Sequence, residues 1–211
     1  MIWQFDRIPK ICFGAGVRHQ LLSLMQPLGQ RVLLVTGASS FERLPDAVRL
    51  VADWQTAGCL VFHERVSGEP SPDWVDDCVA RHADRQIELV LAIGGGSAID
   101  AAKAVAGLLP VQESVINYLE GLGVEKTYTA QALPFIAVPT TAGTGAEATK
   151  NSVLSRHGEQ GFKKSFRHES LMPTWAVVDP EWMTSLTPAQ IAGNGLDAIT
   201  QLIEGYTATK A

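Results

Sequence analysis

The sequence predicts an α/β fold in which helices cover both faces of a parallel sheet, followed by the beginning of an all-helical domain. Three observations carry this prediction. Short apolar runs rich in β-branched residues alternate with amphipathic segments of helical length. Turns rich in glycine or hydroxyl residues directly follow two of these runs. After residue 180 the apolar runs stop and helical sequence takes over.

The expected elements follow one another in a regular order along the chain. Strands are expected at 31–36, 59–63, 87–93, 133–139 and 174–180, and helices between them at 45–58, 71–85 and 98–109. The last helix starts with a capping box, because Thr187 fits the N-cap, Pro188 the first helical position and Gln190 the third. We therefore expect two domains, 1–181 and 182–211, with the remainder of the second domain absent.

Composition excludes several classes of protein. A hydrophobic fraction of 46% supplies enough apolar material for a core and is inconsistent with disorder. A net charge of −5 offers no basic surface for nucleic acid. No apolar run is long enough to cross a membrane, and the N-terminus has charge and proline where a signal peptide needs an apolar core. Three scattered cysteines suit a reducing compartment, so a cytoplasmic location is expected.

The stretch GGGS after the 87–93 strand is the first candidate site. Gly94, Gly95 and Gly96 would let a phosphate approach the backbone at the start of a helix, and Ser97 adds a hydroxyl at the expected N-cap. Asp100 would lie in the first helical turn, where it could simply complement the helix dipole. A tight strand-to-helix turn without any ligand explains the same glycines.

A second loop, PTTAGTGAE, follows the 133–139 strand. Thr140, Thr141 and Thr144 supply hydroxyl groups between glycines, which suits a phosphate or a ribose, although ordinary turns use the same residues. Two such loops at the carboxyl ends of apolar strands favour a nucleotide-type ligand.

Four stretches in this order, GGGSAIDAAKAVA, PTTAGTGAEAT, WAVVDPE and GLDAITQLIEGY, resemble the iron-containing (group III) alcohol dehydrogenases, and ICFGAG near the N-terminus fits as well. The resemblance implies a dinucleotide-binding α/β domain and a helical domain, with a divalent metal, iron or zinc, between them. It implies hydride transfer between NAD or NADP and a small alcohol or carbonyl substrate, in a homo-oligomer. By motif, Gly95, Gly96 and Ser97 would meet the pyrophosphate, with Asp100 nearby, and Thr140, Thr141 and Thr144 the phosphate and nicotinamide ribose. Lys163 would reach that ribose, and Asp197 would bind the metal.

Two departures from the family pattern bear on cofactor and metal. Gly37 stands where many NAD-using members have an aspartate, and Ser39 and Ser40 follow it, which favours NADP because no carboxylate repels a 2′-phosphate. Gly37 could also serve only a turn. Gln201 stands where the family has a histidine, four residues after Asp197 and on the same helical face. An amide oxygen is a weaker ligand for iron or zinc than imidazole.

The helix at the end of the chain allows a second interpretation. Leu196, Ile199, Leu202, Ile203 and Tyr206 form an apolar stripe, and Asp197, Gln201 and Glu204 could be its solvated back. The family's two remaining metal ligands are downstream histidines, whereas all histidines here precede Asp197, so the 211 residues alone are expected to be inactive. No proton donor can be named. The alternatives are a glycerol-dehydrogenase-like polyol oxidoreductase and a non-catalytic nucleotide-binding fragment.

Overall fold

A computed structural model describes residues 7–122 and 125–208 of the chain. Its strands are β1 (Lys10–Phe13), β2 (Arg31–Gly37), β3 (Leu60–Val66), β4 (Leu89–Gly94), β5 (Phe135–Pro139), β6 (Asn151–Arg156), β7 (Phe162–Arg167) and β8 (Trp175–Val178). Its α-helices are α1 (Leu21–Met25), α2 (Ala47–Thr56), α3 (Pro72–His82), α4 (Gly96–Leu108) and α5 (Pro188–Thr207). Short 3₁₀ turns join them, including η1 (Val17–Gln20), η5 (Ala146–Ala148) and η7 (Pro180–Met183).

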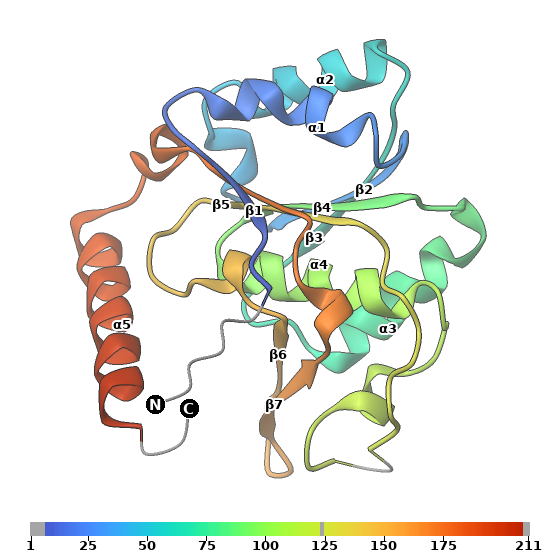
Figure 1. Ribbon diagram of the computed structural model, residues 1–211, viewed down its shortest axis with the longest axis vertical. Coiled ribbons are helices and arrows are strands. Elements are labelled where there is room, and N and C mark those ends of the chain that lie inside the picture. Colours follow the sequence, from blue (N-terminus) through green and yellow to red (C-terminus); the bar gives the residue numbers. More distant parts are fainter. Residues whose placement is uncertain (1–6, 123–124, 209–211) are drawn as a thin grey trace.

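The main sheet has six strands in the order β1-β8-β5-β4-β2-β3, and every neighbouring pair is parallel. Helices α1 and α2 cover one face and α3 and α4 cover the other (Figure 1). The predicted α/β class is therefore confirmed. Because all strands run in one direction, the loops after β2, β3, β4 and β5 meet at one edge of the sheet.

The centre of the core is β4, β5 and α4. Every residue of the two strands is buried, as expected for parallel strands covered on both faces. Helix α4 is alanine-rich and almost wholly buried, so small side chains let it lie close to the sheet and to the hairpin. A Cβ on Gly107 would lie 2.7 Å from Leu171 Cδ2 and 2.8 Å from Phe166 Cε1, which explains the glycine in mid-helix.

Four elements were not expected from the sequence. Strand β1 pairs with β8 over four residues, α1 follows it, and β6 and β7 form an antiparallel hairpin beside α4. The hairpin strands, NSVLSR and FKKSFR, lack a clear apolar alternation because two of their buried positions are serines, Ser152 and Ser155. The expected N-cap at Ser97 was wrong: α4 begins at Gly96, so Gly95 is the N-cap and Ser97 lies in the first turn.

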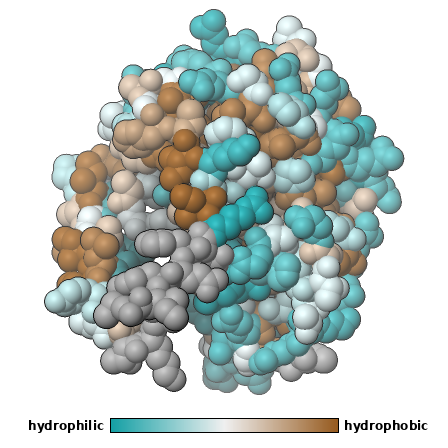
Figure 2. Space-filling view, in the orientation of Figure 1, coloured by the Kyte–Doolittle hydropathy of each residue, from teal (hydrophilic) through white to brown (hydrophobic). Residues whose placement is uncertain are grey.

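Helix α5 leaves the sheet domain and stands at its side (Figure 1). Its predicted capping box is confirmed: Gln190 N–H donates to Thr187 Oγ1, and Gln190 Oε1 accepts from Thr187 N–H. The apolar stripe is exposed, from 54% for Ile199 to 92% for Tyr206, and apolar side chains gather where α5 lies (Figure 2). Within the described residues, no helix has both the length and the apolar character needed to cross a bilayer.

Candidate functional site

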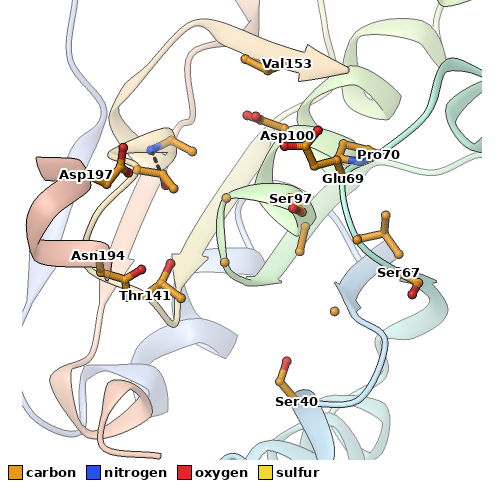
Figure 3. A pocket seen from close by; sticks show the side chains of 18 of the residues that line it. Ser40, Ser67, Glu69, Pro70, Ser97, Asp100, Thr141, Val153, Asn194 and Asp197 are labelled. Atoms are coloured by element: carbon orange, nitrogen blue, oxygen red, sulfur yellow. Dashed lines mark hydrogen bonds between the residues drawn. The ribbon is translucent and has the colours of Figure 1, made fainter. Parts of the chain in front are cut away.

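A cleft of about 950 Å³ opens at the carboxyl edge of the parallel sheet, within the size range of cofactor pockets. The loops after β2, β3, β4 and β5 line it, together with the β6–β7 hairpin and α5. Ser40 and Ser67 lie on one side, Asn194 and Asp197 on the other, and Ser97 between them (Figure 3). The two sides thus come from opposite ends of the sequence.

Most residues singled out in the sequence line this one cleft. They are Gly37, Ser39, Ser40, Gly95, Gly96, Ser97, Asp100, Thr141, Thr144, Lys163, Asp197 and Gln201. Gly94 and Thr140 are not among the lining residues. Both are buried, and the N–H of Thr140 donates to the carbonyl of Gly94 at 3.0 Å, so they join the ends of β4 and β5 behind the cleft.

The N-terminus of α4 faces the cleft with its glycine turn. A Cβ on Gly96 would lie 2.9 Å from Thr144 Cγ2, and a Cβ on Gly94 would lie 2.7 Å from that of Ala98. Packing between the two loops and the first helical turn therefore already requires glycine at both positions. Gly95, Gly96 and Ser97 line the cleft, so the N-terminus of α4 borders it, a geometry suited to a phosphate.

Asp100 lines the cleft one turn into α4. Burial raises the pKa of its carboxyl to about 6, although Lys103 and the N–H of Val153 favour the ionised form. A pKa near 6 lies close to the pH at which most enzymes work. Such shifted pKa values are typical of functional sites but also of buried structural groups. In either role the ionised form is costly to this fold.

Lys163 lies at the rim of the cleft and is paired there. Its ammonium donates to Glu69, which also accepts from the hydroxyl of Ser155. Both contacts lower the pKa of Glu69. The pair joins the hairpin to the loop after β3, so Lys163 would have to leave Glu69, or share it, to reach a ribose.

Helix α5 presents its polar face to the cleft. Gln190, Asn194, Asp197 and Gln201 line it, and Gln201 Nε2 donates to the carbonyl of Gly143 at 3.2 Å. A Cβ on Gly143 would lie 2.8 Å from the carbonyl oxygen of Asn194 and 2.9 Å from its Cα, so only glycine lets the helix backbone come this close. Asp197 and Gln201 are exposed, as expected for a solvated face of the helix, but both line the cleft, whereas the residues of the exposed apolar stripe do not.

Asp197 and Gln201 fit part of a metal site. The hydrogen bond to Gly143 uses the amide nitrogen of Gln201, so its oxygen stays available as a ligand beside the Asp197 carboxylate. Two oxygen donors suit a hard divalent cation, but catalytic zinc has three protein ligands. Among the described residues, Asp197 belongs to no group of three converging His, Cys, Asp or Glu side chains.

The one such group in the described part of the chain lies elsewhere. Glu64, Cys78 and His82 bring their ligand atoms within 4.8 Å of one another between β3 and α3. Arg81 binds both oxygens of Glu64 at 3.0 Å, and His82 Nε2 lies 2.8 Å from the same carboxylate. Burial raises the pKa of Cys78 to about 12, which keeps the thiol protonated. We interpret this group as an internal ion pair that fastens α3 to the sheet.

The sequence did not reveal several cleft residues. Asn151 and Asn194 each have one buried amide atom, Oδ1 and Nδ2, without a hydrogen-bonding partner among the described residues. Such orphaned atoms are rare in native proteins, and here both belong to residues that line the cleft. The loop Ser67–Pro70 was also missed, although a turn at the carboxyl end of β3 could have been placed at the same edge from the strand order.

Comparison with known proteins decides the family. The family model described as iron-containing alcohol dehydrogenase matches residues 9–180. The chain belongs to the iron-containing alcohol dehydrogenases. Within this family it is 33% identical over 199 residues to long-chain-alcohol dehydrogenase 1 of Geobacillus thermodenitrificans, covering 94% of the chain and 49% of that relative. It is 30% identical to the NADPH-dependent butanol dehydrogenase of Clostridium saccharobutylicum, covering 94% of the chain and 50% of the relative.

Solved structures of iron-containing alcohol dehydrogenases and related reductases share the fold. An archaeal halo-thermophilic alcohol dehydrogenase from a Red Sea brine pool superposes with a TM-score of 0.90 at 27% identity, covering 100% of this chain and 55% of that one. Sulfoacetaldehyde reductase from Bifidobacterium kashiwanohense, solved with NAD⁺, gives 0.85 at 31% identity, with 98% and 54% covered. The chain spans about half the length of these relatives.

Proposed function

We propose that the chain is the cofactor-binding part of an oxidoreductase that transfers a hydride between NAD(P) and a small alcohol or its aldehyde or ketone. The observation that carries the proposal is the single cleft in which the N-terminus of α4, the threonine loop after β5 and the polar face of α5 meet. Asn151 and Asn194, each with one buried amide atom that has no partner among the described residues, line the same cleft, which supports a polar ligand there.

In this proposal the pyrophosphate lies at Gly95, Gly96 and Ser97, and Thr141 and Thr144 bind phosphate or ribose. Gly94 and Thr140 support these loops from behind, as their mutual hydrogen bond indicates. The nicotinamide then points toward α5, because the helix closes the cleft on that side. Hydride chemistry belongs to the nicotinamide, and the protein contributes position and electrostatics.

We further propose NADP as the preferred cofactor. Gly37, Ser39 and Ser40 line the cleft at the end of β2, with no carboxylate among them. Lys163 is the only basic side chain among the described lining residues, and it pairs with Glu69. Phosphate recognition at this end would therefore depend on hydroxyl and backbone donors, which bind less tightly than an arginine.

A divalent metal, iron or zinc, is proposed at Asp197, with Gln201 as a second oxygen donor. When bound, such an ion polarises a carbonyl or lowers the pKa of an alcohol. The division into domains at 1–181 and 182–211, a cytoplasmic location and a homo-oligomer belong to the same proposal. The domain division is supported by the end of the apolar strand pattern near residue 180, and the location by the three scattered cysteines.

The proposal is tested by titrating the purified chain with NADPH and NADH, following energy transfer from tryptophan to the nicotinamide. Butyraldehyde reduction is then measured with and without added Fe²⁺ or Zn²⁺. The variant Ser97→Asp places a carboxylate at the phosphate position without the clash that a Cβ on Gly96 would make with Thr144, whereas Gly193→Asp places a carboxylate on α5, where a Cβ meets nothing within 4 Å. We expect binding that S97D abolishes and G193D preserves.

The outcome also separates the alternatives. Binding together with turnover supports full oxidoreductase activity of the 211 residues. Binding without turnover supports a cofactor domain that needs further residues for chemistry. If the native chain binds neither NADPH nor NADH, the proposed function is wrong.

A further inference from the structure

Lys103 is a fully buried lysine in the middle of α4, with a relative exposure of 0%. Its ammonium donates to the carbonyls of Ala146, Thr149 and Asn151 at 2.8, 2.7 and 2.8 Å, and it lies 2.9 Å from Thr149 Oγ1. A lysine has three N–H donors, so these acceptors account for all of them. None of this was evident from the sequence, where the lysine belongs to an alanine-rich run.

Burying the ammonium group of Lys103 costs free energy, which its hydrogen-bonding partners must offset. Burial lowers the pKa of Lys103 to about 8, against the opposing effects of Asp100 and Glu147. Fully buried lysines are rare unless they are paired, and here the partners are backbone oxygens and one hydroxyl. The segment from Ala146 to Asn151 leaves the 3₁₀ turn η5 and enters β6, so the ammonium binds carbonyls where the chain changes from one structure to the other.

All three residues held by Lys103 line the cofactor cleft. Ala146, Thr149 and Asn151 form its wall on the hairpin side, and Asn151 also contributes one of the orphaned amide atoms. Lys103 itself does not line the cleft. Lys103 therefore holds the segment 146–151, which forms this wall, against α4 without contacting the cleft. The N-terminus of the same helix is the proposed phosphate site.

We propose that Lys103 is a positioning residue for the cofactor site, which orders the segment 146–151 through its backbone carbonyls. This inference rests on the proposed cofactor function, but the ordering of the segment can be measured without cofactor. A neutral side chain of similar length would remove the donor that three carbonyls share and would leave those of Ala146 and Asn151 with only long bonds from Thr149, at 3.3–3.4 Å. We therefore expect the segment to loosen while the sheet stays intact.

The test compares Lys103→Met and Lys103→Ala with the native chain. The matched control is Tyr128→Phe, which removes another buried hydrogen bond to α4, from Tyr128 Oη to the carbonyl of Gly107 at 2.6 Å, at a residue that does not line the cleft. Hydrogen exchange of the amides in 146–151 reports the segment directly. Titration with NADPH reports the cleft, and far-UV circular dichroism reports the fold.

We expect faster exchange confined to 146–151 in both Lys103 variants, and NADPH binding weakened about tenfold or more, since each lost buried donor corresponds to roughly a factor of ten. Methylammonium should partly restore NADPH affinity in K103A, whereas tetramethylammonium, which has no N–H donor, should not. Y128F should lower the unfolding midpoint without changing NADPH affinity.

Two results would overturn the inference. One is a folded K103M with native exchange in 146–151. The other is a rescue of K103A in which tetramethylammonium is as effective as methylammonium. If K103M does not fold, Lys103→Gln takes its place. Because glutamine keeps two N–H donors, we then expect a smaller increase in exchange in 146–151 and a smaller loss of NADPH affinity. A native chain that binds no NADPH defeats the proposed function, while the exchange measurement still decides whether Lys103 orders the segment.

Discussion

Replacing Asp100 with asparagine should make the chain more stable at neutral pH. Burial raises the pKa of Asp100 from its ordinary 3.8 to about 6, so the folded state holds the proton more tightly than the unfolded state does. Its favourable effect on folding is complete below about pH 4 and is lost as pH rises through about 6, because the folded protein must then bury a carboxylate. The asparagine side chain of D100N would keep an acceptor oxygen for the N–H of Val153 and would never ionise.

The magnitude follows from the two pKa values. At about 1.4 kcal/mol per pKa unit, the ionised carboxylate destabilises the fold by up to about 3 kcal/mol above pH 6. Urea unfolding followed by tryptophan fluorescence at pH values between about 4 and 8 measures this. The difference in free energy of unfolding between D100N and the native chain should grow across the interval and then level off.

Asp84→Asn is the matched control, because Asp84 is exposed and the charge change is the same. Its difference from the native chain measures the general effect of removing one surface charge and is subtracted from that of D100N at each pH. A D100N difference that is flat from about pH 4 to 8, or that shrinks as pH rises, would refute the argument that burial dominates at Asp100.

Three further predictions follow from the cleft and from α5. Gly37→Asp should reverse a preference for NADPH over NADH by about tenfold or more through charge repulsion. Gly37→Ala, which brings the same Cβ to 3.0 Å from Ser40 Oγ, should keep the preference, and NADH preferred by the native chain would contradict us. Gln201→His should tighten the binding of Fe²⁺ or Zn²⁺ measured by equilibrium dialysis, and Gln201→Leu should weaken it, with little change in NADPH affinity. If neither variant changes metal affinity, Gln201 is not a ligand. Finally, the exposed stripe should make the chain self-associate in sedimentation velocity, and Leu202→Lys should reduce this; a strictly monomeric native chain would count against it.

The parallel sheet could be predicted because its signals are local. Strands β2, β4 and β5 are uninterrupted apolar runs, and turn residues end each of them. The hairpin could not, because β6 and β7 are polar strands and their partner is α4, far away in the sequence. The role of Lys103 was hidden for the same reason: its acceptors lie more than forty residues downstream.

The site was partly predictable because strand order places loops. Glycine and threonine turns directly after β4 and β5 had to meet at one edge of a parallel sheet, and they do. Asn151 and Asn194 gave no such signal, since an asparagine in a sequence shows neither its burial nor the absence of a partner for its amide.

Helix α5 shows why amphipathic periodicity alone could not settle the metal question. Periodicity says that a helix has two faces, and the usual expectation places the apolar face against the protein. Here the contact with the sheet domain is made by polar and small groups, Asn194 against Gly143 and Gln201 on the Gly143 carbonyl. Close backbone approach at a glycine, rather than apolar burial, therefore turns Asp197 toward the cleft. The same approach makes Gly143 the residue on which the orientation of Asp197 depends, although it carries no side chain.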